Sequence, residues 1–367
     1  MGSVPSQFDK AIRNFLRPVK TVETRRKPKK RRHITLKNRT IPIVTEGTHG
    51  GGASNYDYDP ATGLSHTRLD FRDRPNTKQR WKDPTKPGEL YTDLEFPLDV
   101  AIEEYKKEKI QWKRPREFRD NPVLFSDGTT IYEVGQRSAG TCWFVSMVAD
   151  LAKNEDTIYK NIPLDGWNPD TGVLKCVFYH FGEWVTVYTD DFLPVVDGET
   201  LWGAGSFSDN NEMWVSMLEK CFARLHGSYN AIYGGQACDS YLALTGGVAE
   251  VLDFRKQKPD PDQFFARVRN SLRAGSYLTC SILATYNAYK GLIADHAYSL
   301  TGVGVVHTKD CGNVCLLRIR NPWGFHEWKG AWSDRSKEWD SVVEKTLDHT
   351  KKDDGEFWMC LDDYMKY

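Results

Sequence analysis

The chain has 367 residues, of which 40% are hydrophobic, 13% aromatic and 27% charged. This length predicts two or three domain-sized units, and this composition excludes a wholly disordered chain. The longest uncharged run near the middle, Gly275 to Tyr289, is shorter than the ~18 residues expected of a membrane span. The N-terminus shows no apolar signal-peptide core, and eight Cys are ordinary usage. We therefore expect a cytoplasmic protein with mostly buried thiols.

The net charge of zero hides a strong asymmetry along the chain. Residues 1–40 contain 13 Lys and Arg side chains but only two acids, Asp9 and Glu23, so this segment carries +11. Residues 41–367 carry 37 basic and 48 acidic side chains, which sum to −11. This distribution argues against a nucleic-acid-binding module, because the positive charge does not extend over the body of the chain.

The basic tail has a pattern of its own. Four apolar residues fall at helical spacing and predict a short amphipathic helix ending before Pro18; they are Phe8, Ile12, Phe15 and Leu16. Residues 25–32 form a basic run that repels itself, and residues 48–85 have the composition of a linker. We expect residues 1–86 to be a disordered tail and linker.

This tail also predicts a location. Met1 to Ser6 fits the N-myristoylation pattern, and a polybasic segment supplies the second signal that stable anchoring needs. Residues 1–40 would then bind an anionic membrane surface and make the protein peripheral. The alternatives are a solvated basic tail and a nuclear-import signal.

The rest of the chain predicts an α+β fold with a helical half followed by a β-rich half. Helical patterns cover Asp99–Ile110, Cys142–Lys153, Glu212–His226 and Asp262–Arg273, and an extended segment covers Ile110–Pro115. Strand patterns cover Lys175–Tyr188, Tyr277–Leu283, His296–Val306, Cys315–Arg320 and Glu356–Leu361. The Gly234-Gly235 break divides them into a first lobe, residues 87–234, and a second lobe, residues 235–367, with a site expected in the cleft between them.

Cys142 is the first candidate for chemistry. It opens a buried helix and follows Gly140, and a helix N-terminus favours a thiolate through its dipole and free N–H groups. Gln136, six residues upstream, is a side-chain donor that a tight loop could aim at a developing oxyanion. A buried core Cys beside a Trp is the alternative interpretation.

Two later residues complete a pattern. His296 lies on a predicted strand, and Asn321 ends another strand before Pro322. An Asn oxygen can accept from a His N–H and orient the ring, and Trp323 could shield that bond from water. Alone, His296 could be a satisfied core histidine and Asn321 simple turn chemistry. Together, the order Gln, Cys, His, Asn is that of the papain-like thiol proteases.

At this point the sequence resembles the calpain protease core over roughly residues 87–367. The motifs that carry the resemblance include Gly140-Thr141-Cys142-Trp143, Asn211-Glu212-Met213-Trp214, Leu218-Glu219-Lys220, His296-Ala297-Tyr298-Ser299, Arg320-Asn321-Pro322-Trp323-Gly324, the run 327–334 and the run 354–359. The resemblance implies a papain-like two-lobe fold and an intracellular, calcium-dependent cysteine endopeptidase that performs limited proteolysis of protein substrates.

The resemblance also implies roles for five residues. Cys142 would be the nucleophile, His296 its general base and acid, and Asn321 the residue that orients His296. Gln136 and the Cys142 backbone N–H would form the oxyanion hole, with Trp323 packed over the triad.

Two calcium sites are implied as well. The first would use the carbonyls of Ser126 and Gly128 with the side chains of Glu133 and Glu212. The second would use four carboxylates and one carbonyl, those of Glu327, Asp334, Asp354, Glu356 and Lys352. Mixed carboxylate and carbonyl oxygens suit Ca²⁺. Glu212 could instead close a helix capping box, Asp354-Gly355 could be an ordinary turn, and Glu133 an exposed strand acid.

Two departures from the family pattern stand out. Thr141 replaces the Asp that commonly precedes the nucleophile, a change that we expect to matter little to the chemistry. Glu133 stands where Asp is usual, which predicts a first calcium site of different affinity. Calpains usually continue into a C2-like and a penta-EF-hand domain, whereas the given sequence ends at Tyr367. It is therefore either a fragment of a longer calpain or a minimal form.

Two other functions fit the sequence less well than a protease does. A papain-like acyltransferase orients its His with Asp, so Asn321 and Gln136 argue against it. A catalytically silent binding scaffold is disfavoured by an intact Cys, His and Asn set.

Overall fold

The computed structural model describes residues 56–59, 64–67, 82–282, 289–344 and 347–367. Its α-helices are short and lie mostly in the middle of the chain; they are α3 (Leu98–Ala101), α4 (Cys142–Leu151), α5 (Glu155–Asn161), α6 (Trp214–His226), α7 (Ala237–Thr245), α8 (Pro261–Arg273) and α9 (Leu361–Lys366). Single 3-10 turns cover Pro115–Glu117, Asn230–Ile232 and Lys337–Ser341.

The strands form small antiparallel sheets. Those in the first half are β1 (Tyr56–Asp59), β2 (Leu64–Thr67), β3 (Gln111–Lys113), β4 (Val134–Gly135), β5 (Trp167–Asn168), β6 (Val173–His180), β7 (Glu183–Asp190), β8 (Leu193–Val196), β9 (Thr200–Leu201) and β10 (Gly205–Ser206). The second half contributes β11 (Thr279–Ile282), β12 (His296–Thr308), β13 (Gly312–Arg320) and β14 (Glu356–Cys360), which pair in that order as one sheet.

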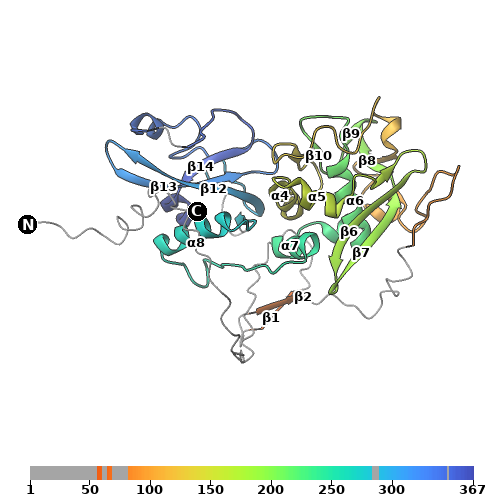
Figure 1. Cartoon of the computed structure of the whole chain (residues 1–367), viewed down its shortest axis with the longest axis horizontal. Coiled ribbons are helices and arrows are strands. Elements are labelled where there is room, and N and C mark those ends of the chain that lie inside the picture. Colours follow the sequence, from red (N-terminus) through yellow and green to blue (C-terminus); the bar gives the residue numbers. More distant parts are fainter. Residues whose placement is uncertain (1–55, 60–63, 68–81, 283–288, 345–346) are drawn as a thin grey trace, which may run out of the picture.

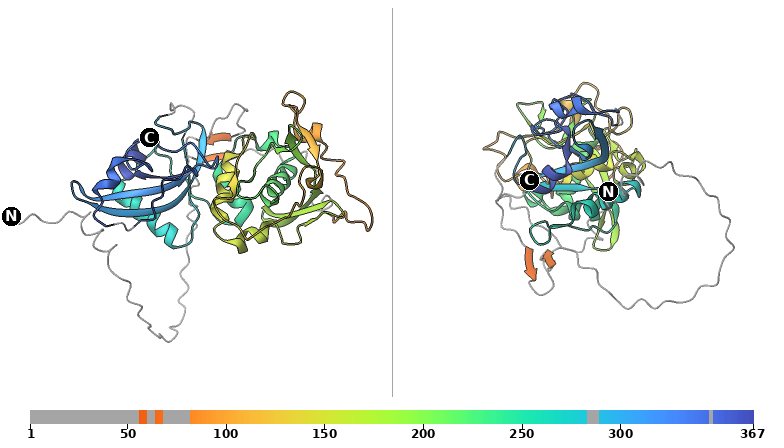
Figure 2. Two further views of the ribbon diagram at one scale, coloured as in Figure 1. Left: turned by 90° about the horizontal axis from the view of Figure 1, so that it is seen from above. Right: turned by 90° about the vertical axis from the view of Figure 1, so that its left-hand side faces the viewer.

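The two halves lie side by side as two lobes, both in Figure 1 and from above in Figure 2. The core of the first lobe gathers around α4 and α6, where Phe144 and Phe222 stack with ring centroids 4.2 Å apart. Every residue of α4 after Cys142 is buried, as expected for a helix that is apolar on all faces. This burial fixes the direction in which the start of α4 points.

The second lobe is built on the long β12–β13 hairpin. Its core lies between this sheet and the helices α8 and α9, with Tyr298, Leu317 and Phe357 among its buried members. Because β12 begins at His296 and β13 ends at Arg320, the strand ends bring His296 and Asn321 to the same edge of the sheet. That edge faces the start of α4.

Direct hydrogen bonds join the lobes. The Ser299 hydroxyl donates to the Ser146 carbonyl in α4 over 2.7 Å, and the Gln136 N–H donates to the Pro322 carbonyl over 2.8 Å. The buried Arg320 guanidinium donates to the Val134 carbonyl over 3.0 Å. Helix α4 is thus held against the strands next to His296 and Asn321.

The predicted elements agree with the structure except in two places, the first being the β1–β2 hairpin, which lies in the segment expected to be a disordered linker. The α+β fold class is confirmed, with the helices and strands after residue 110 within a few residues of their predicted ends. The helix predicted over Asp99–Ile110 is wrong, because α3 ends after one turn and irregular turns follow. Tertiary bonds replace the helical ones there: Tyr229 N–H donates to the Ala101 carbonyl and Glu103 N–H to the Asn230 side chain.

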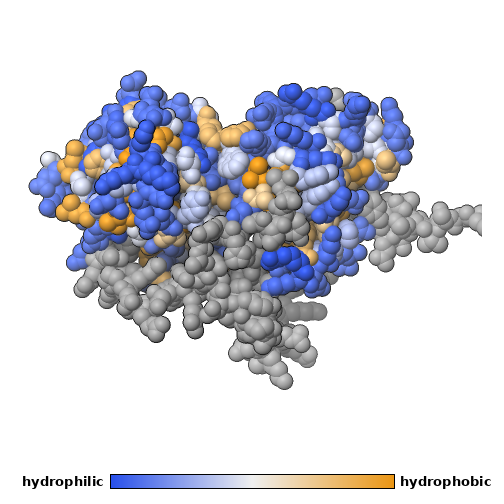
Figure 3. Space-filling model, turned by 180° about the vertical axis from the view of Figure 1, so that it is seen from behind, coloured by the Kyte–Doolittle hydropathy of each residue, from blue (hydrophilic) through white to orange (hydrophobic). Residues whose placement is uncertain are grey.

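The predicted tail helix, the myristoylation motif and the basic run all lie outside the described residues. Among the residues that are described, no helix is both long and apolar enough to span a bilayer. The face in Figure 3 is largely hydrophilic, with scattered hydrophobic side chains. The lobe boundary at Gly234-Gly235 remains a prediction.

Candidate active site

Cys142 is the first residue of α4, so its thiol lies at the positive end of a helix dipole. Burial raises the pKa of this thiol, and the charge of Asp295 adds to the rise. The N–H groups of Ala297, Trp143 and Cys142 itself oppose the shift because they stabilise the thiolate. Burial therefore opposes the thiolate, while these three N–H groups favour it.

His296 and Asn321 form the hydrogen bond that a thiol protease needs. His296 Nε2 and Asn321 Oδ1 lie 2.8 Å apart, and both side chains are buried. The Asn321 amide is itself fixed, because its Nδ2 donates to the carbonyls of Phe325 and His326 at 2.9 and 3.0 Å. With its amide orientation set, Asn321 presents oxygen to the ring, and the other ring nitrogen is left for Cys142.

The imidazole is shielded from water. The ring of Trp323 lies 4.6 Å from that of His296, centroid to centroid, at an angle of 50°. Burial lowers the pKa of His296 to about 4, although the bond to Asn321 works in the opposite direction. Burial thus disfavours the charged form of both the thiol and the imidazole.

Two hydrogen bonds hold the side chain of Gln136, the expected oxyanion donor, in place. Its Oε1 accepts from the Trp323 indole N–H at 3.0 Å, and its Nε2 donates to the Ala139 carbonyl at 2.7 Å. An amide nitrogen has two N–H groups, so one remains for a ligand beside Cys142. The clamp crosses the cleft, because Gln136 belongs to the first lobe and Trp323 to the second.

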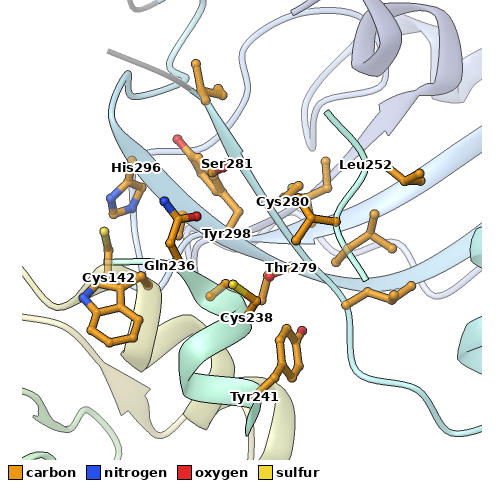
Figure 4. Close-up of a pocket in the computed structure, with 18 of the residues that line it drawn as sticks. Cys142, Gln236, Cys238, Tyr241, Leu252, Thr279, Cys280, Ser281, His296 and Tyr298 are labelled. Atoms are coloured by element: carbon orange, nitrogen blue, oxygen red, sulfur yellow. The ribbon is translucent and has the colours of Figure 1, made fainter. Parts of the chain in front are cut away.

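A cavity of about 890 Å³ opens beside these residues and reaches between the lobes. In Figure 4, Cys142 from α4 faces His296 from β12, while Cys238 and Tyr241 on α7 face Thr279 on β11. Its lining includes Cys142 and His296, so a ligand in this cavity would lie beside both side chains.

Tyr233 is a wall of this groove that the sequence analysis missed. Its ring packs on Gly140, where a Cβ atom would come within 2.5 Å of the ring. The backbone around it is fixed, since Gly234 N–H donates to the Gly140 carbonyl and the Trp143 indole donates to Ile232. The sequence offered one signal for this role of Tyr233, the neighbouring Gly234-Gly235 motif, which we interpreted only as a hinge.

The residues expected at the second calcium site form an acidic cluster. Glu327 Oε1 accepts from the N–H groups of Asp354 and Gly355 at 3.0 and 2.9 Å. Burial raises the pKa of Asp334 to about 7, and the charges of Glu327, Asp354 and Glu356 add to the rise. Asp334 Oδ2 is buried with no hydrogen-bond partner among the described residues. Such a carboxylate is costly unless a cation compensates it. Lys352, the expected carbonyl ligand, is exposed in the neighbouring turn.

The first expected calcium site has the same character. Glu212 Oε1 accepts from the Ser126 N–H at 3.0 Å, while its buried Oε2 has no partner in the described part of the chain. Burial raises the pKa of Glu133, and the Glu212 charge contributes. Gly128, with a positive φ of 75°, lies against Glu155. The capping-box alternative for Glu212 fails, because it bonds Ser126 rather than the start of α6.

The oxygens of these clusters do not converge on a point. Within the described residues, no three His, Cys, Asp or Glu side chains are placed to hold a metal ion together. The charges of Glu327, Asp354 and Glu356 nevertheless raise the pKa of Asp334, and the charge of Glu212 raises that of Glu133. The carboxylate and carbonyl oxygens of the two clusters, with their unpartnered members, are of the chemical type that suits calcium.

Comparison with known proteins agrees with this site. Residues 91–367 match the family model described as calpain family cysteine protease. The chain is 36% identical to calpain-8 of Rattus norvegicus and to the calpain-1 catalytic subunit of Homo sapiens, each over 297 residues. It is 37% identical to calpain-9 of Rattus norvegicus over 292 residues. Each match covers 76% of this chain and 41% of the relative, so the chain spans about two fifths of these relatives. The chain belongs to the calpain family of cysteine proteases.

Proposed function

We propose that the chain is a calcium-dependent cysteine endopeptidase that cleaves protein substrates at a limited number of sites. The observation that carries the proposal is the 2.8 Å bond between His296 and Asn321 at the strand edge facing Cys142. A buried imidazole that is oriented by an amide and faces a thiol at a helix start is a general base beside its nucleophile.

The reaction follows from these positions. His296 takes the proton of the Cys142 thiol, and the thiolate attacks a peptide carbonyl. The Cys142 N–H and the free N–H of Gln136 stabilise the oxyanion, and His296 then protonates the leaving amine. Water, activated by the same imidazole, hydrolyses the thioester. Because burial disfavours the ion pair at rest, closure around a substrate must supply part of its stabilisation.

Calcium dependence is supported by the two acidic clusters. Each has a buried carboxylate oxygen without a partner among the described residues, on Glu212 and on Asp334. Ser126, Gly128, Glu133 and Glu212 would hold one ion, and the cluster from Glu327 to Glu356 the other. Bound calcium would supply positive charge that removes the repulsion within each cluster. The carboxylates lie on both sides of the cleft, so their positions affect how the lobes meet.

The two alternatives from the sequence are less well supported. A catalytically inactive binding scaffold would not require the hydrogen bonds that fix the side chains of Gln136 and Asn321. An acyltransferase would be expected to use a carboxylate where Asn321 lies. We therefore favour peptide hydrolysis, and we propose that it takes place in the cytoplasm. We propose separately that residues 1–40 recruit the protein to anionic membranes. We also propose that calcium acts on these two clusters themselves, without a penta-EF-hand domain.

The proposal is tested with casein and with a peptide epoxide that alkylates thiol protease nucleophiles. Wild-type chain in calcium should cleave casein and carry the label on Cys142. Cys142→Ser should lose both, because a hydroxyl is far harder to ionise than a thiol. Cys238→Ser, at another thiol in the same cavity, is the matched control and should retain both. Label on Cys238 with activity in Cys142→Ser would refute the assignment.

A further inference from the structure

The loop before Cys142 is anchored to a buried carboxylate that plays no part in the mechanism above. Glu219 lies in the middle of α6 and is only 1% exposed. Its Oε1 accepts from the Thr141 hydroxyl at 2.6 Å, and its Oε2 accepts from the Ala204 N–H at 2.7 Å. Thr141 is the residue directly before the nucleophile.

This carboxylate has no cationic partner to explain its burial. Lys220, the next residue, is also fully buried but donates to the Asp190 carbonyl at 2.8 Å and pairs with the Asp190 carboxylate. In the described part of the chain no basic side chain pairs with Glu219. The negative charge of Glu219 instead raises the pKa of the buried Tyr229 hydroxyl. An unpaired buried carboxylate costs stability, so the two hydrogen bonds that it accepts are its compensation.

The surrounding backbone is shaped to admit Glu219. A Cβ atom on Gly203 would lie 2.2 Å from Glu219 Oε2, so only glycine allows this approach. The Ser138 N–H donates to the Trp202 carbonyl at 3.0 Å, which ties the same loop to the same segment. The loop from Gln136 to Cys142 therefore rests on α6 and on residues 202–204 at two points.

The start of α4 has no side-chain cap. A Thr at the N-cap position usually accepts a hydrogen bond from the first turn of its helix. Thr141 is the N-cap of α4 but makes no such bond, and its hydroxyl is directed to Glu219 instead. The N–H groups of Cys142 and Trp143 therefore remain available at the nucleophile, where a thiolate and an oxyanion need them.

We infer that Glu219 is a positioning residue, which acts through the Thr141 hydroxyl to hold Cys142 and the oxyanion-binding N–H groups in register. The sequence predicted that Thr141 in place of the usual Asp would matter little. In the structure, its hydroxyl is the hydrogen-bond donor that connects the loop to Glu219. The inference rests on the proposed function, because it assigns the anchor to the same nucleophile. It concerns this chain in particular, since an Asp at position 141 could not donate to Glu219 without a shared proton.

The test compares Thr141→Val, Thr141→Ser and Thr189→Val in the full chain. Thr189 is a fully buried threonine whose hydroxyl has no partner within the described residues, so its substitution removes the same atoms without breaking such a bond. Thr141→Val should lower kcat for casein at least about tenfold with little change in KM, since misplacement by ~1 Å can cost a hundredfold. Thr141→Ser and Thr189→Val should stay within about twofold of wild type.

A second readout does not depend on peptidase turnover. The rate of Cys142 alkylation by iodoacetamide, followed on the Cys142 peptide by mass spectrometry, should fall in Thr141→Val and recover in Thr141→Ser. In a Glu219→Leu background, which has no side-chain oxygen to accept from the Thr141 hydroxyl, adding Thr141→Val should have little further effect, because the two act as one unit. Equal rates for Thr141→Val and Thr189→Val, or failure of Thr141→Ser to recover them, would overturn the inference. If the wild type does not cleave casein but the variants still differ in Cys142 alkylation as expected, the peptidase proposal is refuted. The positioning role of Glu219 is supported in that case.

Discussion

The backbone N–H of Asn321 donates to the carbonyl of Gly355 over 2.8 Å. Gly355 is fixed in turn by Glu327, whose carboxylate accepts its N–H. The acidic cluster of the second lobe is therefore two hydrogen bonds away from the residue that orients His296. The close approach is possible because Gly355 has a φ of 81° and no Cβ, which would lie 2.8 Å from the Asn321 carbonyl oxygen.

Removing the charge of Glu327 tests this link. Gln at position 327 keeps an oxygen for the two N–H donors but removes the negative charge that calcium would meet. We expect Glu327→Gln to raise the calcium needed for half-maximal activity several-fold and to leave activity at saturating calcium within about twofold. Asp353→Asn, which changes an exposed acid in the same turn, is the control. An equal shift in the control would assign the effect to general charge rather than to the cluster.

The pH dependence of stability should report on Glu219. Burial raises the pKa of Glu219 to about 7, above its ordinary value of 4.5, so the folded state holds this proton more tightly than the unfolded state does. Its contribution to the free energy of unfolding is therefore greatest below about pH 4.5 and is lost as the pH rises through 7.

Denaturant unfolding at several pH values checks this expectation. Between pH 5 and pH 8 the wild type should lose on the order of a few kcal/mol relative to Glu219→Gln, which cannot ionise. Parallel pH profiles of the two proteins would show that the carboxyl titrates normally in the fold.

Tyr233 should set part of the substrate preference. Its ring covers Gly140 beside the nucleophile and is 57% exposed, so one face is available to a substrate side chain. We expect Tyr233→Ser to change the ranking of peptide substrates that differ next to the scissile bond, by about tenfold in kcat/KM. Iodoacetamide alkylation of Cys142 should stay within about twofold of wild type. A uniform loss across all substrates would mean that Tyr233 supports the site rather than selects the substrate.

Residues 1–40 should carry the membrane affinity. Their net charge of +11 predicts binding to vesicles that contain anionic lipid, weakened by salt because exposed charges are screened within ~8 Å at physiological ionic strength. Sedimentation of the full chain is compared with that of a variant in which the Lys and Arg residues of 25–32 are replaced by Gln. Equal sedimentation of the two proteins would contradict the prediction.

The sequence was informative where a local pattern determines the outcome. The apolar residues after Cys142 predicted a buried helix with that thiol at its start, and the Asn321-Pro322 step predicted a strand end. It was misleading at Asp99–Ile110, where the predicted helix does not form. Backbone groups of this segment hydrogen-bond to Tyr229 and Asn230 instead. Contacts between distant segments left little local signal. The anchor of Thr141 on Glu219 joins residues 78 positions apart, and the bond of Tyr132 to Glu356 joins residues 224 apart.

The measurement that tests the account most directly is the rate of casein cleavage by the full chain as free calcium is titrated from chelator to millimolar levels. The account predicts negligible cleavage in chelator, a saturable rise with calcium, and no cleavage at any calcium level by Cys142→Ser. Full activity of the wild type in chelator would contradict the role of the two acidic clusters. Cleavage by Cys142→Ser would contradict the nucleophile itself.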